Sequence, residues 1–178
     1  IGCRGSVSCE FGVNKYPTLN FNMTGFYVAP SDVVHPSGVS FEEHLPPRCR
    51  AAGLTIDAYS PKGINAISVD LANDVQESQC INDSDGITEI FIPNRNPTGN
   101  IDPEVDTLGN FNPFSKWEDS TLVNISGGFG STKGNRVFFE IPKGQIGEPG
   151  YQDRNGKRVY TLPLGLTGDD DEFCLQIG

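Results

Sequence analysis

The sequence is divided into short runs rich in β-branched and aromatic residues, separated by turns that contain glycine or proline. It has 21 glycines and 13 prolines spread over 178 residues, which favours many turns over one disordered tail. Short runs of this kind, several with apolar–polar alternation, are typical of strands. We expect a mainly β or α+β fold, a β-sandwich-like arrangement of antiparallel sheets with few short helices, stapled by disulfides. The predicted strands are residues 21–28, 54–59, 64–71, 87–92, 121–125, 137–141, 157–162 and 173–177.

Local turn chemistry refines this expectation. Asn155-Gly156 predicts a type I′ hairpin, because both residues tolerate positive φ. The glycine-rich residues 127–134 predict a longer connection between strands. Residues 69–79 fit a strand and a helix equally well, and residues 40–45 fit one helical turn. The proline-rich residues 93–120 predict either a long ordered loop in a single domain of residues 1–178 or a boundary between two lobes.

The cysteines indicate an oxidising compartment. They are dispersed and include no CxxC pair, which excludes zinc-ribbon and thioredoxin-like sites. We expect two disulfides of open pairing and one thiol, either buried or linking two chains. The cysteines are Cys3, Cys9, Cys49, Cys80 and Cys174.

Three Asn-x-Ser/Thr sequons, at Asn22, Asn82 and Asn124, predict N-glycosylation. Together with the cysteines they indicate a secreted, extracellular glycoprotein. The chain opens at Ile1, which we interpret as the product of processing.

The net charge of the protein argues against several classes of binding partner. With 13 basic and 23 acidic residues the net charge is −10, and such a surface repels phosphate backbones and anionic lipids. No run of 18 apolar residues is present. Nucleic acid and membrane insertion are therefore poor expectations.

The only cofactor that the sequence suggests is a bound metal ion. Calcium needs clustered carboxylates, and Asp102, Glu104 and Asp106 form the best candidate, although no EF-hand spacing is met. His35 and His44 are predicted to be surface histidines rather than ligands. No other cofactor is expected.

Enzyme chemistry finds little support. HExxH and GxSxG are absent, and residues 128–134 have the wrong spacing for a phosphate loop. A small acid–base ribonuclease needs a His, a Glu and an Arg on one sheet, and His44, Glu140 and Arg136 have these residue types. A glycosidase needs two facing carboxylates, and no pair is singled out. The candidates are Glu42, Glu43, Asp57, Glu89, Glu118 and Glu140.

Aromatic residues give a ligand-binding alternative. Trp117, Phe111 and Phe114 share one loop and would stack on carbohydrate, or would form a small satellite core beneath that loop.

The N-terminal run Cys3-Arg4-Gly5-Ser6-Val7-Ser8-Cys9 resembles the CRGSxxC opening of the killer toxins of smut fungi and related secreted fungal proteins. The resemblance implies a small disulfide-linked α/β sandwich and a bridging role for Cys3 and Cys9. It covers seven residues.

These observations lead to one preferred function and two alternatives. We expect a secreted, non-enzymatic effector or toxin-like protein of fungal type, whose loops at residues 30–48 and 93–120 recognise a host or competitor target. The partner would be an extracellular protein or glycan, and the protein a monomer or a dimer linked through the odd cysteine. The alternatives are a carbohydrate- or cell-wall-binding protein and a carboxylate-dependent hydrolase.

Overall fold

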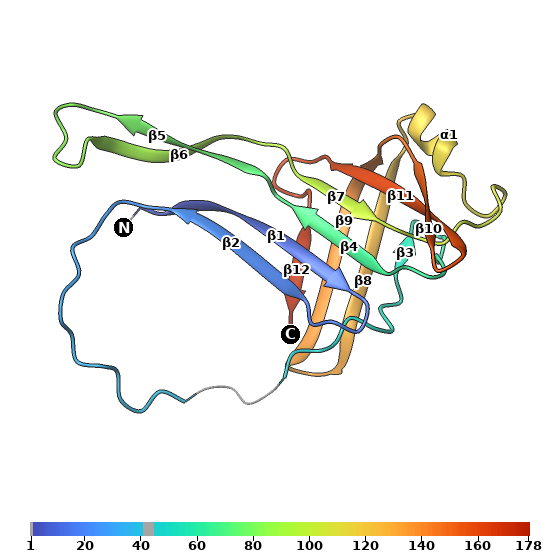
Figure 1. Ribbon diagram of the computed structural model, residues 1–178, viewed down its shortest axis with the longest axis horizontal. Helices are drawn as coiled ribbons and strands as arrows, with labels where there is room; N and C mark the ends of the chain where they lie inside the picture. The colour runs from blue at the N-terminus through green and yellow to red at the C-terminus, as the bar shows by residue number, and fades with distance from the viewer. Residues whose placement is uncertain (1, 41–44) are drawn as a thin grey trace.

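The computed structural model describes residues 2–40 and 45–178, and it is mainly β with antiparallel strands and one short helix (Figure 1). That coarse expectation is confirmed. The elements are β1 (Arg4–Gly12), β2 (Thr18–Thr24), β3 (Thr55–Ile56), β4 (Ala66–Asp70), β5 (Asn73–Gln79), β6 (Ile87–Arg95), β7 (Thr98–Ile101), α1 (Pro113–Glu118), β8 (Leu122–Thr132), β9 (Asn135–Ile146), β10 (Gly150–Arg154), β11 (Lys157–Leu166) and β12 (Cys174–Ile177).

Most strands belong to one sheet with the order β2-β1-β4-β7-β11-β9-β8-β3, to which β10 adds beside β11 and β12 beside β9. The sheet curls, so strands distant in this order face each other across the core. Phe11 of β1 stacks on Phe139 of β9 with ring centroids 4.8 Å apart, and Phe129 of β8 lies 5.7 Å from Phe11. Alternate residues of β8, β9 and β11 point into this core, as the period of a strand requires.

A long two-stranded ribbon runs through the sheet and beyond it. Its inner half is β4 paired with β7, and its outer half is β5 paired with β6, where Asn73 lies opposite Arg95. Between the halves, Ala72 takes a positive φ of 45° and Pro97 interrupts the other side. The outer half projects away from the body (Figure 1). Residues 69–79, which fitted helix and strand equally, thus lie in β4, a short break and β5.

Of the connections predicted from local turn residues, one is confirmed and one is wrong. Asn155 and Gly156 have φ of 55° and 79° between β10 and β11, which confirms the predicted type I′ hairpin. Asn112 begins the helix by accepting from the amides of Phe114 and Ser115, and Pro113 follows it. The predicted glycine-rich connection was wrong, since β8 continues to Thr132.

Several expected boundaries also shifted. The strand expected at residues 21–28 lies at Thr18–Thr24 as β2, and that expected at residues 54–59 shortens to β3. The helical turn expected at residues 40–45 falls mostly outside the described residues. In the described ranges, no helix has both the length and the apolar character that a bilayer crossing demands.

The disulfide expectation is wrong for this structure, because all five cysteines are free. They stand on separate elements: Cys9 is buried in β1, Cys80 follows the outer end of β5, and Cys174 begins β12. Backbone ladders and an apolar core hold these elements instead.

Candidate assembly surfaces

The first surface is the open edge of the sheet formed by β2. This strand ends the strand order and pairs only with β1 among the described strands. On it Leu19 packs towards the core, whereas Phe21 and Met23 are 66% and 55% exposed. An unpaired edge offers backbone donors and acceptors to another chain, and natural proteins usually protect it with charge. Here the edge carries apolar side chains instead.

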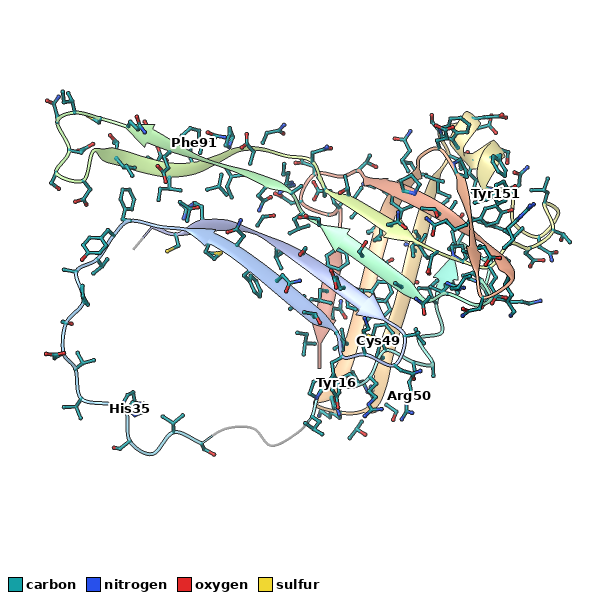
Figure 2. The ribbon with its side chains drawn as sticks, viewed as in Figure 1. Tyr16, His35, Cys49, Arg50, Phe91 and Tyr151 are labelled. Carbon is teal, nitrogen blue, oxygen red and sulfur yellow. The ribbon has the colours of Figure 1, made fainter. Side chains whose placement is uncertain are left out.

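The second surface is the extended segment of residues 25–40 that follows β2. It contains no helix or strand, and its amides donate to no other backbone group in the described chain. It leaves the body in a wide arc, on which His35 is marked (Figures 1 and 2). Tyr27, Val33 and Val34 are largely exposed on it, Val34 at 94%. Clustered exposed apolar residues of this kind mark interaction surfaces.

The third surface is the projecting hairpin, which comprises β5, β6 and their connection, residues 73–95. Apart from each other, its strands mainly contact β1. The hairpin carries five carboxylates, and Arg95 at its base is already paired with Asp170 and Glu172 at 2.7 and 2.8 Å. The carboxylates are Asp74, Glu77, Asp83, Asp85 and Glu89.

The fourth surface, called the basic end, is defined by five cationic residues: Lys15, Arg48, Arg50, Lys133 and Arg136. The backbone joins its parts, because the amide of Cys49 donates to the carbonyl of Lys15 at 2.7 Å. The guanidinium of Arg48 lies over the Tyr16 ring, 5.8 Å from its centroid. None of the five cations forms an ion pair with a carboxylate that the structure describes. Tyr16, Cys49 and Arg50 lie together at this end, away from Phe91 on the projecting hairpin (Figure 2).

The carboxylates of the predicted calcium site take protein partners, and Arg154 lies within ion-pair distance of both Asp102 and Glu104. Asp102 binds Arg154 at 2.8 Å, and Glu104 binds Lys157 at 3.0 Å. Asp106 accepts from the amide of Thr107 at 2.7 Å, a bond that is the largest cause of its lowered pKa. Within the described ranges no group of three His, Cys, Asp or Glu side chains is placed to hold a metal. These contacts fasten the connection after β7 to its neighbours.

The predicted aromatic cluster divides between core and surface. Phe111 is buried and stacks on Tyr59 at 4.8 Å, and Phe114 lies 6.2 Å from Tyr160. Burial, followed by the charge of Asp106, raises the pKa of Tyr59 to about 12. Trp117 on α1 is partly exposed.

The predicted glycosylation sites differ in setting. Asn22 is exposed on β2, and Asn82 lies in the turn of the projecting hairpin. Asn124 on β8 donates its side-chain amide to Glu140 at 2.7 Å, and a glycan would disturb that bond.

The hydrolase candidates do not form a facing pair around a described cavity. Asp57 is paired with Lys116 at 3.0 Å, and Arg136 donates to the carbonyl of Ser131. The cavity of about 320 Å³ beside Phe11 and Cys49 has no carboxylate in its described lining. His44, Glu42 and Glu43 lie outside the described residues.

Sequence reasoning missed the β2 edge and the projecting hairpin, whereas the recognition loop expected at residues 30–48 overlaps the extended segment. It placed a strand at residues 21–28, which merged a true edge strand with the start of the extended segment. The signal for the hairpin was its acidity between residues 74 and 89, and the signal for the basic end was Arg48 and Arg50 beside Cys49.

A comparison with family models overturns the toxin interpretation. The model for the phage tail tube protein family matches residues 1–166. Among curated proteins, none matches this sequence. The seven-residue killer-toxin resemblance was wrong: Arg4 to Cys9 belong to β1, where they pair with β2.

The family match also contradicts the expected function, partners and compartment. The secreted fungal effector, the wall-binding alternative and the hydrolase alternative are wrong, as are the glycoprotein and extracellular assignments. The expectation of a monomer that acts on a foreign protein or glycan is also wrong, because tail tube proteins polymerise with each other into the phage tail. The match over residues 1–166 shows that this chain belongs to the phage tail tube protein family.

Proposed function

We propose that this chain is a structural subunit that polymerises with copies of itself to build the tube of a phage tail. The observation that carries the proposal is the unpaired β2 edge with its exposed Phe21 and Met23, in a chain of the tail tube family. In one isolated copy this edge leaves backbone groups and apolar surface in water. A strand from a neighbouring copy would satisfy both at once.

The extended segment supports the same function. Its Tyr27, Val33 and Val34 are 77%, 81% and 94% exposed, so the described residues of a single copy leave them largely uncovered. An unpaired edge and a long apolar arm in one small protein indicate a subunit that completes its packing in an assembly.

The test blocks the edge with charge. Phe21→Lys combined with Met23→Lys places two cations on β2, and lysine on an edge strand opposes strand addition. The purified wild-type protein should form tubes visible by negative-stain electron microscopy and should sediment. The double variant should remain a folded monomer by circular dichroism and analytical ultracentrifugation.

A matched control separates the edge from a general effect of added charge. Leu108→Lys with Leu122→Lys replaces two other exposed apolar residues that lie away from β2. This control should polymerise like the wild type. Tubes formed equally well by the β2 variant would show that the edge is not an assembly contact.

A further inference from the structure

The projecting hairpin and the basic end have opposite charge and do not meet in one copy. The hairpin carries five carboxylates, and its single cation, Arg95, is paired at its base. Glu77, Asp85 and Glu89 form no ion pair or side-chain hydrogen bond with any described residue. In a protein of net charge −10, the basic end is a local concentration of positive charge.

The two surfaces also match in their apolar and charged groups. A cavity of about 330 Å³ at the basic end is lined by Arg48 and Arg50 together with residues 130–132 of the β8 end. Beside it, a mostly apolar groove of about 260 Å³ lies between Pro47, Ile177 and Arg136. The hairpin connection presents Ile81, which is 98% exposed, close in sequence to Asp83 and Asp85. An apolar side chain flanked by carboxylates matches an apolar groove flanked by arginines.

We propose that the projecting hairpin of one copy docks on the basic end of the next copy. The two surfaces differ, so the contact is heterologous, and a heterologous contact that does not close into a ring propagates a polymer. This inference rests on the proposed function and assigns one of its subunit contacts. It is separate from the β2 edge, because neither surface includes Phe21 or Met23.

Charge reversal on each surface gives the test. The hairpin variant is Asp85→Lys with Glu89→Lys, and the basic-end variant is Arg48→Glu with Arg50→Glu. Each variant alone brings like charges together and should raise the critical concentration for polymerisation by about tenfold or more. The measurement is pelleting over a concentration series, with folding checked by circular dichroism.

Mixing the two variants distinguishes docking from damage. In the mixture, the lysine-bearing hairpin of one variant meets the glutamate-bearing end of the other, and the two native surfaces also meet. An equimolar mixture should therefore return the critical concentration to within about threefold of the wild type, in polymers that contain both variants. A mixture that assembles as poorly as its components would overturn the docking.

One control and one further variant complete the design. Glu118→Lys with Glu148→Lys makes the same charge change as the hairpin variant at exposed residues outside both surfaces, and it should assemble like the wild type. Ile81→Ser should also weaken assembly, since it removes the apolar residue that the groove takes; an unchanged critical concentration would contradict that placement.

The outcomes separate this docking from the proposed function. Reversal variants that polymerise like the wild type would overturn the docking and leave the proposed function standing. A wild-type protein that stays monomeric at all concentrations would overturn the proposed function and, with it, the docking.

Discussion

At the scale of single residues, two of the five free thiols belong to the apolar core. Cys9 and Cys49 are buried members of the apolar core. Burial raises the pKa of both thiols, and the charge of Asp70 adds to the effect at Cys9. Both groups therefore act as small apolar side chains with little reactive thiolate at neutral pH.

We expect five free thiols in the denatured, non-reduced protein, each taking one alkyl group detected by mass spectrometry. In the native protein, exposed Cys3 should react with iodoacetamide at least about tenfold faster than Cys9 and Cys49, because reaction needs an accessible thiolate. Intact disulfides in the mass spectrum would contradict this arrangement.

Tyr59 links one residue to stability at alkaline pH. Its folded pKa of about 12 lies above the ordinary value of 10, so folding favours the protonated phenol. The stabilisation is fully present below pH 10 and is lost as pH rises through about 12, because the unfolded chain releases its proton first. Tyr59→Phe should flatten the fall in urea-unfolding free energy over that window. A variant with an unchanged alkaline slope would show that another group controls it.

At the scale of elements, the β8–β9 hairpin depends on its glycines. Gly130 and Gly134 both have positive φ, 85° and 82°. A Cβ on Gly130 would lie 2.0 Å from the carbonyl oxygen of Asn135, whereas one on Gly134 would meet nothing within 4 Å. Both alanine variants bear the backbone strain, about 1–2 kcal/mol, and only the first adds a backbone clash.

Gly130→Ala should therefore lose at least about 2 kcal/mol more unfolding free energy than Gly134→Ala, measured by urea denaturation. Gly134→Ala serves as the matched control because it shares the positive φ. Equal losses would mean that the hairpin adjusts to admit the methyl group.

The same elements show what the sequence could predict. The β10–β11 hairpin followed from two residues, since Asn155 and Gly156 act through their own backbone angles. The glycines of β8 led to the wrong prediction of a connection, because the reason for them lies on a neighbouring strand. The Phe139 ring of β9 lies 3.1 Å from the position that a Cβ of Gly127 would take. Packing demanded these glycines, whereas a sequence pattern treats them as turn residues.

The β2 edge escaped prediction for a related reason. Apolar residues at 21, 23 and 27 satisfy the pattern of a half-buried strand, and a pattern cannot tell whether the burying partner is the same chain or another copy. The strand itself was found, but its exposed edge appeared only once the strand order placed β2 at the end of the sheet.

At the scale of the whole molecule, the surfaces left without partners in one copy should change most on polymerisation. Strands β9 and β11 have ladder partners within the chain, whereas β2 has one open side and the amides of residues 25–40 donate to no other described backbone group. Amides exchange with solvent when they are not hydrogen-bonded, so hydrogen–deuterium exchange separates the two classes.

In the monomer, residues 25–40 should exchange within seconds and β9 far more slowly. In the polymer, β2 and residues 25–40 should gain at least about tenfold protection while β9 and β11 stay unchanged, because only the former acquire new backbone partners. Protection confined to the projecting hairpin and the basic end would keep the charged docking but remove the β2 edge from the assembly.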